Sequence, residues 1–145
     1  MKDKEQIKTY LFAGTAIFSL YSRKINKRVT YRVKRDKYAG SDWCTVATLY
    51  GPDNEFDYRT IGVIKPDGTL LISHKDLNTA EKMIKQFITV IFDSSAEWPE
   101  TMVFEPSDFC AVCGKRLTRS ESLKYGIGPS CLRRLNIING GKNGN

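Results

Sequence analysis

Four cysteines are the residues whose type and spacing point most directly to chemistry. Cys110, Cys113 and Cys131 lie within 22 residues of one another, whereas Cys44 stands alone far upstream. Two thiolates in a C-x-x-C spacing can grip one metal ion from a tight turn, and Gly114 supplies the left-handed backbone that closes such a turn. The spacing therefore predicts a metal centre, and zinc is the metal that this sulfur-rich pattern favours.

The third cysteine follows a Gly128-Pro129 pair. Because proline suits the first position of a helix, we expect Cys131 in the first turn of a short helix, where the helix dipole favours a thiolate. In a treble-clef zinc module, a C-x-x-C turn (the zinc knuckle) is followed by a hairpin and then by a ligand at the start of a helix. The order of parts in this sequence is the same. A redox C-x-x-C is the weaker alternative, because Cys113 is followed by Gly-Lys-Arg and not by a helix start after a strand.

The fourth ligand is left open by the sequence. A treble clef often takes it three residues after the third ligand, but Arg134 occupies that position and cannot bind a metal. A water molecule and four side chains are the candidates: Glu105, Asp108, His74 and, less favoured, Cys44. A full set of protein ligands would make the site structural, whereas an open position would allow catalysis.

Residues 110–131 carry a resemblance to a known family. They match the pattern C-x-x-C-G-R/K-x-L-T-x-x-x-S-x-x-x-G-I-G-P-x-C in register. This pattern resembles a small zinc-module family of unknown function that is abundant in bacteriophage and prophage genomes. The upstream stretches 13–20 and 49–55 are similar to the β-rich domain that often precedes this module.

The resemblance implies a phage origin and a zinc-stabilised module, without implying an activity. Many members of the family carry a histidine shortly before the knuckle. Here the corresponding stretch reads Phe104-Glu-Pro-Ser-Asp-Phe, which draws attention to Glu105. A phage-encoded protein of this kind would work in the cytoplasm of its host cell.

The charge is concentrated in two basic islands. The 145 residues include 23 basic and 16 acidic ones, for a net charge of +7. Residues 22–37 carry a net +7 and residues 110–145 a net +6, so the remaining chain is acidic at −6. Two such islands indicate contact with a polyanion or an acidic partner, although improved solubility is the alternative explanation.

The elements that must position these residues are mostly strands. Five strand-like segments punctuated by turns precede an amphipathic helix, and a short sixth strand follows it: 11–21, 28–35, 43–50, 56–64, 70–73 and 101–104, with the helix at 77–92. In 28–35 the alternation puts Val29, Tyr31 and Val33 on one face and basic side chains on the other. Asn78 or Thr79 would cap the helix.

These elements predict an α+β protein. We expect an antiparallel curled β-sheet or partial barrel with one packed amphipathic helix, followed by a treble-clef-like zinc module. The expected domains are 1–104, the zinc module at 105–138 and a flexible tail at 139–145. The longest apolar stretches fall short of a membrane span and no signal peptide is evident, so we expect a cytoplasmic protein.

We consider three functions. The first is a non-enzymatic phage accessory protein that binds nucleic acid, with Tyr21 and Tyr31 as possible stacking rings. Its expected contact residues are basic: Arg28, Arg32, Lys34, Lys115, Arg116, Arg119, Arg133 and Arg134. The second is a phage inhibitor of a host defence nuclease or polymerase. The third, an enzyme, is disfavoured because a single histidine and no phosphate-binding loop leave few catalytic groups.

Overall fold

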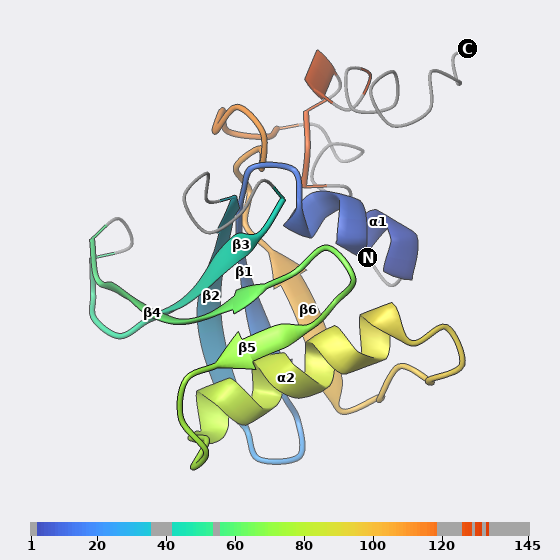
Figure 1. The fold of residues 1–145 in the computed structure, drawn as a ribbon. Helices are drawn as coiled ribbons and strands as arrows, with labels where there is room; N and C mark the ends of the chain where they lie inside the picture. The colour runs from blue at the N-terminus through green and yellow to red at the C-terminus, as the bar shows by residue number, and fades with distance from the viewer. Residues whose placement is uncertain are drawn as a thin grey trace.

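The computed structural model describes residues 3–35, 42–53, 56–118, 126–128, 130–131 and 133. The predicted tail at 139–145 lies outside these residues. Two helices and six strands are described: α1 Lys4–Leu11, β1 Thr15–Ser22, β2 Lys27–Arg35, β3 Cys44–Leu49, β4 Tyr58–Ile64, β5 Leu70–Ile72, α2 Thr79–Phe92 and β6 Met102–Pro106 (Figure 1). The α+β class is confirmed.

The six strands form one antiparallel sheet in the order β5-β4-β3-β2-β1-β6. The order is linear, so the curled sheet is open. The predicted hairpin at residues 23–26 joins β1 to β2 and places Tyr21 opposite Arg28. Asn26 adopts φ 53°, a left-handed conformation that asparagine tolerates in tight turns. The last strand, β6, returns to pair with β1 along its other edge.

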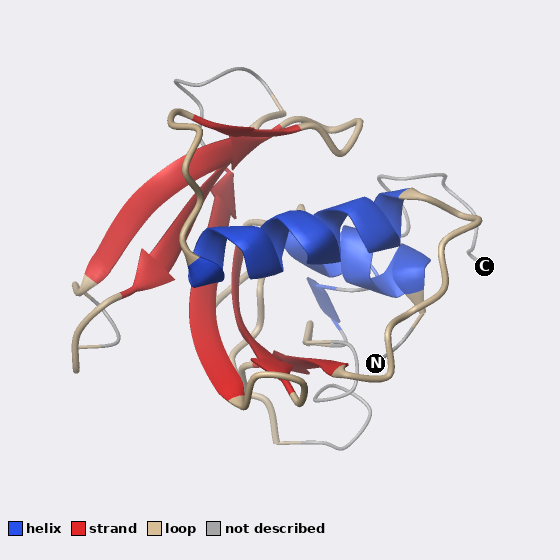
Figure 2. Cartoon of the chain, turned by 90° about the horizontal axis from the view of Figure 1, so that it is seen from below, coloured by secondary structure: helices blue, strands red, loops and turns tan. Residues whose placement is uncertain are grey.

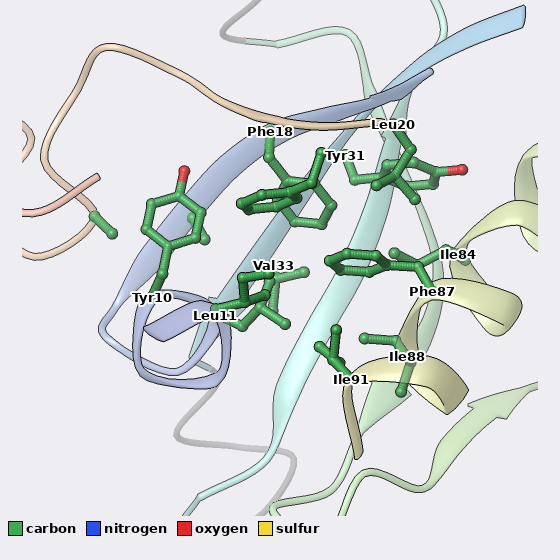
Figure 3. Packing of buried hydrophobic residues seen from close by; sticks show 14 of the residues in the cluster. Tyr10, Leu11, Phe18, Leu20, Tyr31, Val33, Ile84, Phe87, Ile88 and Ile91 are labelled. Atoms are coloured by element: carbon green, nitrogen blue, oxygen red, sulfur yellow. The ribbon is translucent and has the colours of Figure 1, made fainter. Parts of the chain in front are cut away.

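Helix α2 lies across the inner, concave side of this sheet (Figure 2). A capping box fixes its start: the Asn78 side chain accepts from the Glu81 N–H, and the Glu81 carboxylate accepts from the Asn78 N–H. On its buried face Phe87 contacts Phe18 of β1, with ring centroids 5.7 Å apart (Figure 3). The predicted amphipathic helix is therefore confirmed, with Asn78 as its cap.

The prediction of a single helix is wrong, because α1 precedes the sheet. Residues 11–14 were expected in the first strand, but Leu11 ends α1 and β1 begins only at Thr15. The Asp3 side chain accepts from two N–H groups of the first turn, and Ile7, Tyr10 and Leu11 are buried against the core. An isolated helix of 8 residues is unstable in water, so this tertiary packing decides its conformation.

The cysteine segment packs onto the same core as the sheet. One cluster of buried residues contains β-sheet and helix side chains together with Cys110, Ala111, Leu117, Ile127 and Cys131. Strand β6 ends at Pro106, two residues beyond the domain boundary expected from the sequence. The sheet and the cysteine segment thus share one hydrophobic core. A substitution that destabilises one of them should also destabilise the other.

Helices able to cross a membrane are absent from the described part of the chain: neither α1 nor α2 is long and apolar enough.

Candidate metal centre and basic surface

A tight hairpin, residues 109–116 and hereafter the knuckle, holds the first two cysteines. Phe109 and Arg116 form an antiparallel bridge at its base. Inside it, the Cys110 N–H donates to the Lys115 carbonyl at 2.8 Å and the Gly114 N–H to the Cys110 carbonyl at 2.9 Å. Gly114 adopts φ 78°, and a Cβ atom at this position would meet no other atom. The left-handed backbone, and not a lack of space, therefore requires a glycine here.

The return segment brings the third cysteine to the knuckle. The Ala111 N–H donates to the Gly126 carbonyl at 3.0 Å, and the Gly128 N–H points at the Cys110 sulfur at 3.2 Å. Cys131 follows in helical backbone. The sulfurs of Cys110, Cys113 and Cys131 consequently lie within 4.8 Å of one another, although Cys131 is 18 residues after Cys113 in the sequence.

These three thiols fit a metal ion. Sulfurs that share a tetrahedral ion at about 2.3 Å must lie roughly 4 Å apart, which is compatible with the observed cluster. Burial by itself would raise the pKa of the Cys110 thiol, but N–H groups of Cys113, Gly128 and Val112 outweigh it and lower that pKa to about 7. Such N–H···S contacts are what orients and stabilises thiolate ligands in a metal site.

Cys44 has the opposite environment. It is fully buried in β3, among the core residues, and burial raises the pKa of its thiol to about 11. A neutral thiol in the core is a small apolar side chain rather than a metal ligand. The sequence-based interpretation of Cys44 as a buried hydrophobe is confirmed.

The other candidates for the fourth ligand have partners of their own. Glu105 pairs with Arg28, Asp108 with Arg116 at 3.2 Å, and His74 with Glu81 at 2.8 Å. Within the described residues no histidine or carboxylate joins the three sulfurs in one cluster. Asp53, which sequence reasoning did not connect to the cysteines, lines an open hollow beside Cys110 and Cys113. The fourth ligand stays a prediction.

The predicted basic strand face points away from α2. We call this side of the sheet the outer face; it includes Ile17, Ser19, Tyr21, Arg28, Thr30, Arg32, Lys34, Tyr58 and Glu105. The Arg28 guanidinium lies 5.2 Å from the centroid of the Tyr21 ring, its cross-strand neighbour. The Arg32 guanidinium lies 4.4 Å from the Tyr58 ring. Aromatic rings therefore alternate with cations on this face.

Tyr31, the second tyrosine considered for base stacking, is unsuited to that role. It is fully buried on the inner face, its ring stacks on Phe18, and its hydroxyl donates to the Ala80 carbonyl of α2 at 2.6 Å. Tyr58 was not considered from the sequence, because only a bulge in β4, where Ile61 has no partner in β3, brings it to the outer face next to Arg32.

The basic residues of the cysteine segment are described in part. Lys115, Arg116 and Arg133 are exposed, and Arg116 is the partner of Asp108. Arg119 and Arg134 lie outside the described residues. The outer face and the knuckle meet where β6 runs into residues 107–109: Arg28 of the first basic island and Asp108, the partner of Arg116 in the second, line the same hollow.

Comparison with known proteins identifies a family for one part of the chain. Residues 100–136 are similar to a family of unknown function, DUF6011. This segment contains β6, the knuckle and all three clustered cysteines. No curated protein and no solved structure matches the chain. The similarity thus marks the candidate metal centre as a recurring module and leaves its activity open.

Proposed function

We propose that this protein is a non-enzymatic, zinc-stabilised accessory protein of phage origin that binds nucleic acid through the outer face of its sheet. The observation that carries the proposal is the pair of guanidinium–tyrosine contacts, Arg28 with Tyr21 and Arg32 with Tyr58, on one face beside Lys34. The resemblance of residues 110–131 to a phage module supports the origin.

Such contacts suit a polyanion with aromatic bases. A guanidinium stacked on a ring is held in place while its N–H donors stay available for phosphate oxygens. Tyrosine rings next to these cations offer faces for base stacking. The inner face cannot serve in this way, because α2 covers it.

Zinc would act in the fold rather than in a reaction. Cys110, Cys113 and Cys131 would hold the ion in a treble-clef-like module, and its binding free energy would add to the stability of the segment that carries Lys115 and Arg116. The knuckle contacts β1 directly, since the Thr15 N–H donates to the Ala111 carbonyl at 2.7 Å. A bound ion would therefore stabilise the edge of the outer face.

Binding of a labelled oligonucleotide, followed by fluorescence anisotropy over a series of salt concentrations, tests this proposal. We expect log affinity to fall linearly with log salt, because phosphate contacts release counterions. The variant Arg32→Glu/Lys34→Glu should bind about tenfold or more weakly and with a smaller salt slope. Its matched control is Lys82→Glu/Lys85→Glu, the same charge change on the exposed side of α2.

A salt-independent affinity, or equal losses in the two variants, would contradict a specific role of the outer face. Affinity purification with and without nuclease treatment tests the alternative function, inhibition of a host protein. A single protein partner that remains at fixed stoichiometry after nuclease treatment would favour an inhibitor of a host enzyme instead.

A further inference from the structure

We propose that a pocket on the outer face, next to the knuckle, accepts one unpaired nucleobase, so that the protein selects single-stranded over duplex nucleic acid. This inference rests on the proposed function. The pocket has a volume of about 490 Å³. Its main lining residues come from four strands and the segment after β6: Ser19, Arg28, Thr30, Tyr58, Glu105 and Phe109. Ligand pockets for small organic molecules start at about 300 Å³, so a base fits this space.

Phe109 is the first reason to expect an aromatic ligand. Its side chain is 47% exposed, although it directly precedes the buried Cys110. The bridge to Arg116 and the Leu117 N–H bond to the Asp108 carbonyl at 2.7 Å fix the backbone on either side. The fold thus holds a large apolar ring at the rim of a pocket, which costs solvation free energy and suits stacking against a base.

The polar groups of the pocket suit the edge of a base. Arg28 and Glu105 form an ion pair at one side and present N–H donors beside carboxylate acceptors. The Ser19 and Thr30 hydroxyls bond to each other at 2.8 Å on the adjacent strands. The edge of a nucleobase also has hydrogen-bond donors next to acceptors. The donors and acceptors of the pocket can therefore pair with those of a base.

Tyr58 adds an unsatisfied group at the same place. Its ring contributes to the lining, and its buried hydroxyl has no hydrogen-bond partner among the described residues. A buried hydroxyl without a partner costs free energy in the unbound protein. A shift of the ring on binding that lets this hydroxyl donate to the polar edge of the base would recover that energy.

A pocket of this kind favours single strands for a geometric reason. In a duplex both faces of every base are stacked and its pairing edge is occupied, whereas an unpaired base can leave the stack and enter a pocket. Arg32 and Lys34 continue along β2 from the pocket side, where they would meet the phosphates of neighbouring nucleotides. DNA and RNA single strands share this chemistry.

The test uses labelled 12-mers as single-stranded DNA, single-stranded RNA and duplex DNA, with the full-length protein. We expect a preference of at least tenfold for a single strand, and the tighter of the two single strands identifies the natural ligand class. Phe109→Leu should lower single-strand affinity about tenfold while duplex affinity and the salt slope stay unchanged, because only stacking is removed. The matched control Phe56→Leu alters another exposed phenylalanine, which does not line the pocket, and should have no effect.

Two further readouts report on the pocket itself. The fluorescence of 2-aminopurine in the single strand should be quenched by the wild-type protein and less so by Phe109→Leu. Tyr58→Phe should weaken single-strand binding several-fold without lowering the melting temperature, because the lost hydroxyl has no partner in the free protein. Salt-dependent binding with equal affinity for duplex and single strand, and no effect of Phe109→Leu, would overturn the pocket alone. Failure to bind any of the three nucleic acids would overturn the proposed function as well.

Discussion

The ring of Tyr10 in α1 lies directly against Gly126, in the segment that returns to the knuckle. A Cβ atom at position 126 would sit 2.4 Å from Cε1 of this ring, closer than atoms can approach. The Tyr10 hydroxyl in turn donates to the Ile17 carbonyl of β1 at 2.7 Å. One side chain from the start of the chain therefore connects the candidate metal centre to the sheet.

Gly126→Ala should therefore destabilise the protein strongly. Position 126 has φ 69°, so alanine adds backbone strain to the clash with Tyr10. We expect a loss of about 2 kcal/mol or more in the free energy of unfolding, measured by urea denaturation. Gly114→Ala is the control, since it has φ 78° but open space around its Cβ, and should cost only about 1 kcal/mol. Equal losses would show that Tyr10 does not restrict position 126.

Cys113→Ser should remove bound metal. Cys113 is the exposed member of the cluster, so its substitution leaves the core packing intact. Elemental analysis should find zinc in the purified wild-type protein and much less in the variant, with faster hydrogen exchange in residues 107–118. Cys44→Ser, a core substitution, should lower the melting temperature but keep the wild-type metal content. A metal-free wild-type protein would refute the zinc site.

Glu81 should make stability depend on acid pH. Burial would raise the pKa of this carboxyl, which is 2% exposed, but hydrogen bonds from the Asn78 N–H and from His74 outweigh it and hold the pKa below its ordinary value. Because the folded state lowers this pKa, the carboxylate stabilises the protein above the ordinary glutamate pKa of about 4.3. That contribution is lost as the pH falls through the lower folded value.

Urea denaturation of the wild type and Glu81→Gln from pH 7 to pH 3 measures this effect. We expect the variant to be less stable by about 1 kcal/mol at pH 7, the usual size of a helix-capping contribution. The difference should shrink toward pH 3, because protonation of this carboxyl in the unfolded state progressively removes the stabilisation. A difference that stays constant over this range would contradict the role of the ionised form.

Glu105→Gln should strengthen nucleic-acid binding. Glu105 faces Arg28 on the outer face and would repel phosphates. Glutamine keeps an acceptor oxygen for the base edge in the pocket but carries no charge. Affinity should therefore rise about two- to fivefold at low salt, with a smaller gain at high salt because salt screens the repulsion. Glu97→Gln, an exposed carboxylate in the segment after α2, is the control and should change the affinity little. Anisotropy titrations at two salt concentrations compare the variants, and weaker binding by Glu105→Gln would contradict the assignment.

Local interactions explain which parts of this protein could be predicted from its sequence. The knuckle closes through bonds between Cys110 and Gly114 or Lys115, the β1–β2 hairpin through a turn of four residues, and the start of α2 through Asn78 and Glu81. Partners so close along the chain leave a residue pattern that can be read directly. The same holds for Tyr21 and Arg28, which face each other because the hairpin sets their register.

Only the tertiary structure decided the remaining features, because their partners are distant in sequence. Helix α1 depends on burial of Ile7, Tyr10 and Leu11 in the common core, and β6 pairs with β1 across some 80 residues. The contact of Arg32 with Tyr58 requires the extra residue Ile61 in β4, and the outer pocket requires the knuckle to lie beside the sheet. The cysteine motif and the basic strand could each be predicted from the sequence. Only long-range packing makes them neighbours on one surface.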